Sequence, residues 1–466
     1  MSSTSKVAET LNPAIFRAYD IRGTVGEDLN DDVAEAIGSA YGTYIQRISG
    51  NRIVIGRDNR PSSEPYQTAL IRGLRSTGCD VTNIGFSPTP LLYFATAHRQ
   101  YDGGINITGS HNPPKYNGFK LTEKSAAPLA EEQIQDVRRL IEAGDFATGE
   151  GSLDHWSPED EYVEFLAGQS RLARPMKVVI DGGNGIAGPL AVRVLREIGA
   201  EVIGLYIEPD GSFPNHLPDP EIQATLKDLR RLVLDRKADL GIAFDGDGDR
   251  IGVIDENGTH YEADYILILL ARDFLTRHPG APVIFDVKCS QNVERDIREH
   301  GGQPIMYRTG HSLIKKKMRE EGILLGGEVS GHMFFGEDYY GVDDGTLASC
   351  RLLSLLSRGT ETISQHLANL PKLYASPELR IPCPDEDKFR VVAEVKQTFS
   401  AQYPILDIDG VRATLPQGWV LVRPSNTNPY LTVRMESDSE QGLESIRQMT
   451  FDLLSGYPSV DLTRVH

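Results

Sequence analysis

Short apolar runs rich in Val and Ile alternate with helix-like segments over most of this 466-residue chain. Such runs, bounded by Gly and Pro, are typical of strands in parallel α/β units. They fall into three successive groups of similar layout, at Arg52–Asp58, Gly78–Phe86 and Gly103–Pro113, at Met176–Gly185, Gly199–Ile207 and Ala238–Arg250, and at Pro282–Ser290, Gly301–Ser312 and Gly322–His332. The repetition predicts three related α/β domains.

The third run of each group ends in a polar, glycine-containing loop. These loops read TGSHNP, DGDGDR and GEVSGH. In parallel α/β folds, functional loops lie outside the carboxyl ends of the strands. We therefore expect three corresponding loops, one from each unit, to face a common cleft.

The C-terminal part follows a different pattern. It predicts a helix over Asp385–Ser400, two strands over Trp419–Arg423 and Tyr430–Glu436, and a final helix over Glu440–Leu454. This order indicates a smaller α+β domain. With this domain added, the predicted division of the chain is into residues 1–155, 156–257, 258–370 and 371–466.

Composition narrows the class of protein. Hydrophobic residues make up 39% and charged residues 24%, as in folded globular proteins. The formal net charge of −18 argues against a general nucleic-acid binder, which usually carries a basic surplus. It does not argue against small anionic substrates, because local cations bind these whatever the total charge.

The apolar segments also bear on location. No stretch approaches the roughly 18 apolar residues of a membrane span, and Met1–Thr10 contains no apolar signal core. These features predict a cytoplasmic protein without a membrane partner. The cysteines are Cys79, Cys289, Cys350 and Cys383. They form no close pair, so we expect reduced, structural thiols.

Three aspartates, Asp245, Asp247 and Asp249, alternate with glycines in FDGDGDR. Carboxylates this close repel one another unless a cation or solvent screens them, and glycine permits backbone shapes that turn all three inward. Oxygen-only ligation suits a hard ion such as Mg²⁺ or Ca²⁺. A solvated acidic turn is the alternative. The apolar strand before the loop and Arg250 after it favour a buried metal site.

Ser110 lies in TGSHNPP, where Gly109 and the pair Pro113–Pro114 indicate a fixed, exposed loop. A serine hydroxyl becomes nucleophilic only when a base or metal activates it. The adjacent His111 is not assigned as that base, because neighbours on an extended loop point apart. Taken alone, the loop is equally compatible with a turn in which the serine hydroxyl acts as a cap.

The segment RPSNTNP lies between two predicted strands and is dense in hydrogen-bond donors, Arg423, Ser425, Asn426 and Thr427. Arginine can hold phosphate oxygens bidentately, and hydroxyls and backbone amides add further bonds. The segment is therefore a candidate phosphate site, although the same composition also suits a polar hairpin turn.

Other polar residues suggest contacts with a phosphorylated sugar. Glu328 and Ser330 in GEVSGH can bond neighbouring hydroxyls, since a carboxylate accepts more than one hydrogen bond. Histidines can handle protons or face phosphate, and arginines and lysines can donate to it. Besides these two residues the candidates are Arg17, Tyr19, Arg22, Lys120, Lys288, His311 and His332. For each of them a structural role is the alternative, as in an ion pair of Arg22 with Asp20.

Taken together, the loops resemble those of the α-D-phosphohexomutases, specifically the bacterial phosphomannomutase/phosphoglucomutase subgroup. The matching stretches are IFRAYDIRG, TGSHNPPKYNGFK, DGDGDR, GEVSGH and RPSNTNPYL, in the family's order between residues 15 and 431. The resemblance implies an α/β fold class, with three related α/β domains with mixed sheets plus a C-terminal α+β domain around a central cleft.

The resemblance also implies roles for single residues. Ser110 matches the family's phosphoserine, Arg250 the arginine beside its phosphate, and Asp245, Asp247 and Asp249 the Mg²⁺ ligands, with the serine phosphate completing the coordination. The implied catalytic set is Ser110, Arg22, Lys120, His332 and Arg250. The implied substrate-binding set is Tyr19, Lys288, His311, Glu328, Ser330, Arg423, Ser425, Asn426 and Thr427.

The activity implied by the resemblance is interconversion of hexose 1-phosphate and hexose 6-phosphate, for mannose, glucose or both. It runs through a phosphoserine and a hexose 1,6-bisphosphate intermediate, with Mg²⁺ as cofactor and the bisphosphate as activator. Small phosphosugars are then the partners of a monomer or weak dimer. The alternatives are a phosphoglucosamine mutase, a metal-dependent phosphosugar phosphatase and a non-catalytic phosphosugar-binding protein.

Overall fold

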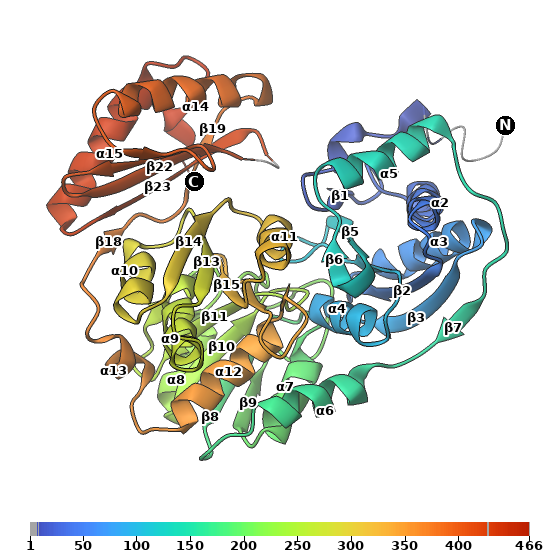
Figure 1. Ribbon diagram of the computed structural model, residues 1–466, viewed down its shortest axis with the longest axis horizontal. Coiled ribbons are helices and arrows are strands. Elements are labelled where there is room, and N and C mark those ends of the chain that lie inside the picture. Colours follow the sequence, from blue (N-terminus) through green and yellow to red (C-terminus); the bar gives the residue numbers. More distant parts are fainter. Residues whose placement is uncertain (1–6, 8, 426–427, 466) are drawn as a thin grey trace.

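Four β-sheets follow one another along the chain, each with its own set of helices (Figure 1). The computed structural model describes residue 7, residues 9–425 and residues 428–465. In the orientation of Figure 1, the first sheet lies on the right, the next two lie together in the lower centre, and the last lies at the upper left.

The first sheet has seven strands in the order β1-β5-β4-β2-β3-β7, with β6 added to β5. The four strands β4, β2, β3 and β7 are parallel, and β1 and β5 are antiparallel to their neighbours. The strands are β1 (Ile21–Thr24), β2 (Arg52–Arg57), β3 (Asp80–Phe86), β4 (Gly103–Ile107), β5 (Tyr116–Glu123), β6 (Ala127–Pro128) and β7 (Leu153–His155), and the α-helices are α2 (Asp31–Arg47), α3 (Ser63–Ser76), α4 (Thr89–His98) and α5 (Glu132–Ala143).

The second and third sheets repeat this central layout. Their strand orders are β12-β11-β10-β8-β9 and β14-β13-β15-β16-β17. The second contains β8 (Lys177–Asp181), β9 (Glu201–Leu205), β10 (Leu240–Phe244), β11 (Ile251–Asp255) and β12 (His260–Tyr261), with α6 (Glu159–Gln169), α7 (Gly188–Glu197) and α8 (Lys227–Arg236). The third contains β13 (Pro282–Asp286), β14 (Gln303–Tyr307), β15 (Leu325–Gly327), β16 (Met333–Phe335) and β17 (Val342–Asp343), with α9 (Ala263–Arg277), α10 (Gln291–Glu299), α11 (His311–Glu321), α12 (Gly345–Ser357) and α13 (Ile363–Leu367).

Each of these three sheets turns back at the same place. In each sheet, the first of three successive parallel strands lies between the other two, which gives the orders β4-β2-β3, β10-β8-β9 and β15-β13-β14. The next strand, β5, β11 or β16, then returns antiparallel beside the third. The loop in which the chain reverses is one of the three polar loops found in the sequence. The repeated unit and the mixed sheets expected for it are confirmed.

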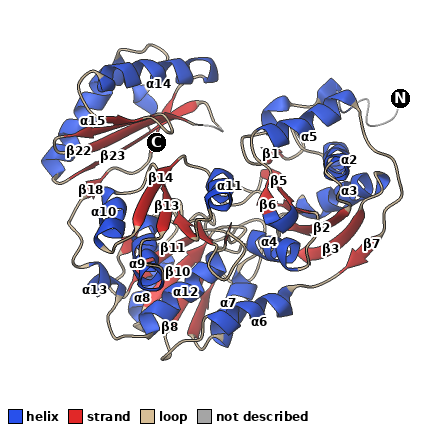
Figure 2. Cartoon of the chain, in the orientation of Figure 1, coloured by secondary structure: helices blue, strands red, loops and turns tan. Residues whose placement is uncertain are grey.

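The C-terminal sheet is antiparallel and carries α14 (Asp385–Ser400) and α15 (Glu440–Ser455) on one face (Figure 2). Its order is β18-β23-β22-β21-β20, with β19 also paired to β23. The strands are β18 (Tyr374–Ala375), β19 (Leu379–Pro382), β20 (Ile405–Leu406), β21 (Val411–Leu415), β22 (Gly418–Pro424) and β23 (Tyr430–Ser437). Helix α14 has the predicted bounds, and α15 ends one residue later than predicted.

The hydrophobic cores show which parts of the chain fold against each other. The second and third sheets share one large cluster that also includes Leu91, Tyr93 and Phe94 of α4. The first and last sheets each have a cluster of their own. The three predicted domain boundaries are not tested by these clusters and stay predictions. Within the described ranges, no helix combines the length and the apolar character that crossing a membrane requires.

Candidate active site

The first two polar loops meet at Ser110. Its hydroxyl Oγ donates a hydrogen bond to Oδ2 of Asp245 at 2.8 Å, although the two residues are far apart in the sequence. The loop is more enclosed than its proline-rich sequence indicated, since Ser110 is only 2% exposed. Its backbone is left-handed at this serine, with φ of +49°, a region that residues other than glycine seldom enter.

His111 corrects one expectation. Its Nδ1 lies 3.2 Å from Oγ of Ser110, whereas an extended loop would turn the two side chains apart. The left-handed turn at Ser110 is the physical reason, because it brings neighbouring side chains to the same side. Burial, with help from Arg250 and Arg22, holds the pKa of His111 well below its usual value, which favours the neutral imidazole.

The second loop joins β10 to β11 and buries all three of its aspartates, Asp245, Asp247 and Asp249. One carboxylate oxygen from each lies within 4.8 Å of the others. Glycine between them is required by the close approach of the loops, since a Cβ at Gly246 would stand 2.3 Å from the carbonyl oxygen of Ser110. The loop therefore packs its carboxylates directly against the serine.

The charges in this loop are only partly compensated by the chain. Lys120 Nζ donates to Asp247 Oδ2 at 2.8 Å and also to Asp249. Burial would lower the pKa of Lys120, but these two carboxylates outweigh it and raise that pKa well above its usual value. Burial, Asp247 and Asp249 together raise the pKa of Asp245.

Two oxygens of the aspartate cluster are left for a ligand. Among the described residues, Oδ1 of Asp247 and Oδ1 of Asp249 have no hydrogen-bond partner, and both atoms are buried. A buried carboxylate oxygen without a partner is costly. A hard divalent cation fits these oxygens, because it prefers carboxylates and would balance the excess negative charge. The acidic loop can thus hold a metal.

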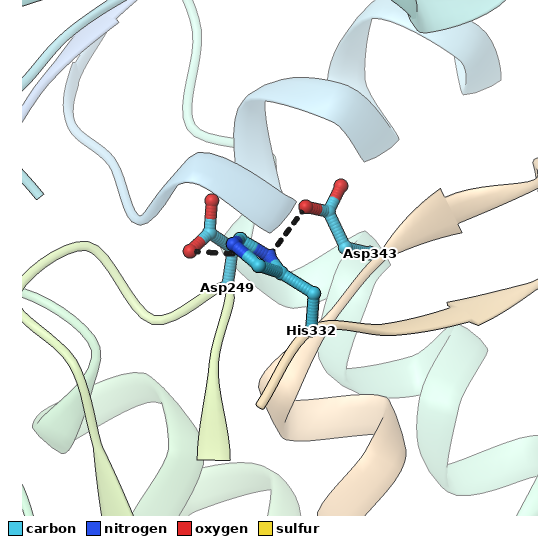
Figure 3. Close-up of side chains that lie close together, drawn as sticks. All are labelled: Asp249, His332 and Asp343. Carbon is cyan, nitrogen blue, oxygen red and sulfur yellow. Dashed lines mark ion pairs between the residues drawn. The ribbon is translucent and has the colours of Figure 1, made fainter. Parts of the chain in front are cut away.

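The third loop brings His332 to the same place (Figure 3). Arg250 Nε donates to His332 Nε2 at 3.0 Å, so Nε2 is the acceptor in this contact. Nδ1 is 2.8 Å from Oδ2 of Asp343 and 3.7 Å from Oδ1 of Asp249. The carboxylate of Asp343 also pairs with the buried ammonium of Lys315 at 2.7 Å. Asp343 therefore orients the imidazole.

A cavity of about 590 Å³ opens above these groups. Ser110 and Tyr19 belong to its lining. The cationic and imidazole side chains that line it are Arg17, Arg22, Lys120, Arg250 and Arg380, with His111, His311 and His332. Burial, followed by Lys315, lowers the pKa of His311 well below its usual value. A pocket with this many positive groups suits a small phosphorylated ligand.

The remaining predicted residues lie outside this lining. Arg423 Nε is held by Asp409 Oδ2 at 3.0 Å, and Lys288 Nζ by Glu378 Oε2 at 2.8 Å. Glu328 accepts from the backbone N–H of Gly310 at 2.7 Å. The other residues in this group are Ser330, which lines a smaller neighbouring cavity of about 70 Å³, and Ser425, which directly follows β22. Asn426 and Thr427 lie outside the described residues.

Several residues in the site were missed from the sequence. Asn428 and Tyr430 line the large cavity; Asn428 lies within RPSNTNP and Tyr430 follows it directly, which was a usable signal. Arg380 on β19 and Asp343 on β17 belong to no motif, so nothing local marks them. Asp343 acquires its place when β17 pairs with β16, and Arg380 when the C-terminal sheet lies against the cavity.

Comparison with known proteins identifies the family. Four models, described as phosphoglucomutase/phosphomannomutase alpha/beta/alpha domains I, II and III and C-terminal domain, match residues 13–148, 160–258, 262–374 and 378–453. The chain is 45% identical to a phosphomannomutase/phosphoglucomutase of Pseudomonas aeruginosa, over 96% of both chains. It is 41% identical to a phosphoglucomutase of Neisseria meningitidis, over 96% of this chain and 98% of the relative.

A solved structure agrees with these relatives. A phosphoglucomutase/phosphomannomutase family protein from Burkholderia thailandensis superposes with a TM-score of 0.90 at 40% identity, covering 97% of this chain and 99% of that chain. The chain is thus a member of the α-D-phosphohexomutases. It belongs to their bacterial phosphoglucomutase/phosphomannomutase family. The resemblance and the fold class expected from the motifs are both confirmed.

Proposed function

We propose that the chain is a phosphohexomutase, which interconverts hexose 1-phosphate and hexose 6-phosphate of mannose, glucose or both. Family membership supports this activity, and the observation that carries it is the contact of Ser110 Oγ with Asp245 at 2.8 Å, at the floor of a cation-lined cavity. A hydroxyl beside a cluster of metal-binding carboxylates is suited to receive and return a phosphoryl group.

Asp245, Asp247 and Asp249 would hold Mg²⁺, together with an oxygen of the phosphate on Ser110. Their two oxygens without partners and their mutual distances support this assignment. When bound, the ion would stabilise negative charge on the phosphoryl group as that group transfers. The ammonium of Lys120, which now donates to two of these carboxylates, would remain nearby as a positive group facing the cavity.

In the proposed resting state, Ser110 carries phosphate. A free hydroxyl of the bound sugar phosphate attacks the phosphorus, the bond from phosphorus to Ser110 Oγ breaks, and a hexose 1,6-bisphosphate forms. The hydroxyl's proton passes to His332, and the ammonium of Lys120 gives a proton to Ser110 Oγ as that oxygen leaves. The bisphosphate then turns end for end and returns its other phosphate to Ser110. Free bisphosphate can rephosphorylate Ser110, which makes it an activator.

Other residues would hold the sugar in both orientations. The distal phosphate would bind Arg423, Ser425, Asn426 and Thr427, with Arg22, Arg250, His311 and Tyr19 nearer to Ser110. The sugar hydroxyls would bond Glu328, Ser330 and Lys288. Arg423 now pairs with Asp409 and Lys288 with Glu378. Substrate phosphate would replace the carboxylate at Arg423, and a sugar hydroxyl would do so at Lys288. A cytoplasmic location and a monomer or weak dimer stay predictions.

The direct test is an assay of the purified chain with Mg²⁺ and catalytic hexose 1,6-bisphosphate. We expect glucose 1-phosphate or mannose 1-phosphate to be converted to the 6-phosphate without release of inorganic phosphate. Release of phosphate with no isomerisation would identify a phosphatase instead. Conversion of glucosamine phosphate alone would identify a phosphoglucosamine mutase.

A further inference from the structure

Arg60 is a fully buried arginine beneath the Ser110 loop. It lies just after β2, its side chain is 0% exposed, and it is absent from the described lining of the cleft. We propose that Arg60 is a positioning residue, which holds the Ser110 loop in its strained conformation and fixes the serine hydroxyl against the aspartate cluster. The inference rests on the proposed function, because it assigns a role in phosphoryl transfer through Ser110.

The guanidinium group uses every one of its N–H donors. Nη2 donates to the carbonyl oxygens of Ser110 at 2.7 Å and Asn112 at 2.5 Å. Nη1 donates to those of Pro113 at 2.8 Å and Tyr116 at 3.1 Å, and Nε pairs with Asp58. A single planar group thus collects four backbone carbonyls of one loop, and no other natural side chain has this fork of donors.

Asp58 completes the clamp from the other side of the loop. Its Oδ2 accepts from Arg60 Nε at 3.0 Å and from the backbone N–H of Gly109 at 3.2 Å. Its Oδ1 accepts from the hydroxyl of Ser63 at 2.5 Å and from the N–H of Arg60. Arg60 and Asp58 therefore bind the loop from Gly109, where it begins, to Tyr116, where β5 begins.

The conformation held by this clamp is one that Ser110 would not adopt alone. The left-handed φ of +49° is disfavoured for serine, and backbone strain persists only where surrounding contacts enforce it. The bond from Arg60 to the carbonyl oxygen of Ser110 fixes the following peptide group, while Oγ on the other side reaches Asp245. Without the clamp, the backbone is expected to relax and carry the hydroxyl away from the aspartates.

Arg60 also contacts the domain that supplies the aspartates. Its guanidinium lies 5.1 Å from the centre of the Phe213 ring, and the neighbouring Asn59 donates to the carbonyl oxygen of Asn184 at 2.9 Å. Two residues further along, the backbone N–H of Ile186 donates to the carbonyl oxygen of Gly246, between the aspartates. Asn59 and Arg60 thus help to fix how the serine loop and the aspartate loop lie relative to each other across two domains.

The experiment compares Arg60→Ala and Arg60→Lys with the wild type in steady state and in uptake of phosphate by Ser110 from hexose 1,6-bisphosphate. A displacement of reacting groups by about 1 Å costs roughly 10²-fold in rate, so we expect kcat and the uptake rate of Arg60→Ala to fall about that far. KM should change by less than about twofold, because uniform substrate binding is untouched. Lysine cannot replace the planar fork of donors, so we expect kcat of Arg60→Lys to fall by about tenfold.

Chemical rescue separates positioning from general stabilisation. Guanidinium ions, added far below concentrations that unfold proteins, should enter the space left in Arg60→Ala and restore kcat by about tenfold. The matched control is Arg272→Ala, in which a well-paired arginine of α9 loses its contacts to Asp296 and the carbonyl oxygen of His366. We expect lower thermal stability there, with unchanged kcat and no response to guanidinium.

The results of these experiments either support or overturn the positioning role of Arg60. Variants of Arg60 that turn over and take up phosphate like the wild type would overturn the positioning role, as would a loss that guanidinium does not restore and that Arg272→Ala shares. If Arg60→Ala does not fold, Arg60→Lys decides: reduced kcat at unchanged KM and unfolding temperature supports the role, and wild-type kcat overturns it. A wild-type chain that takes up no phosphate would instead refute the proposed function.

Discussion

Replacing Ser110 with alanine is expected to abolish turnover between hexose 1-phosphate and hexose 6-phosphate, by at least about 10⁴-fold, because the group that stores the phosphoryl between half-reactions is gone. The fold should persist, since the loop's backbone bonds to Arg60 and Asp58 do not involve the serine hydroxyl. Steady-state turnover, intact mass and thermal unfolding together check this. The variant should carry no phosphate and bind sugar phosphate normally.

The matched control is Ser125→Ala. Ser125 has a similar left-handed backbone, with φ of +60°, but it lies outside the described lining of the cleft. Any loss of stability caused by placing alanine in the left-handed backbone conformation is therefore common to both variants. Full activity of Ser125→Ala beside an inactive Ser110→Ala assigns the loss to the hydroxyl. Near-normal turnover in Ser110→Ala would remove the phosphoserine from the mechanism.

Substitution Asp247→Asn is expected to reduce kcat by roughly 10²- to 10³-fold, since an anionic ligand of the proposed metal site becomes a neutral amide where charge on the phosphoryl group must be stabilised. A second readout does not depend on activity. A ligand that binds only the folded state raises the unfolding temperature, so Mg²⁺ should stabilise the wild type and have little effect on this variant.

Asp255→Asn supplies the comparison for the metal prediction. Asp255 is also a buried aspartate of the same sheet, but its Oδ1 accepts from the N–H groups of Asn257 and Thr259 in a turn. Its substitution should leave the Mg²⁺ response and kcat as in the wild type. An unchanged Mg²⁺ response in Asp247→Asn would contradict the placement of the metal among the aspartates.

Much of the fold could be predicted because its signals are local and repeated. The apolar runs that became β2, β8 and β13 sit at the middle of three equivalent sheets. Each polar loop follows the third strand of its unit, so a rule about strand ends predicts that the loops of Ser110 and Asp245 face a common cleft. The hydrogen bond between Ser110 and Asp245 agrees with this prediction.

What escaped prediction depends on contacts between distant segments. Arg60 follows a strand in an ordinary polar turn, and only the folded chain shows its guanidinium beneath Ser110. Asp343 and Arg380 gain their places through neighbouring strands and belong to no motif. The side chain of His111 was misjudged for another reason, because an extended loop was assumed where the backbone is left-handed.

The transfer of phosphate between Ser110 and sugar is most directly measured in a single turnover. The chain would be labelled with radioactive phosphate on Ser110, and then mixed with unlabelled glucose 1-phosphate or mannose 1-phosphate. The account predicts that the label passes from Ser110 to the sugar and is recovered in hexose 1,6-bisphosphate and hexose 6-phosphate at a rate no slower than kcat. Label that appears as inorganic phosphate, or that resides on a residue other than Ser110, would contradict it.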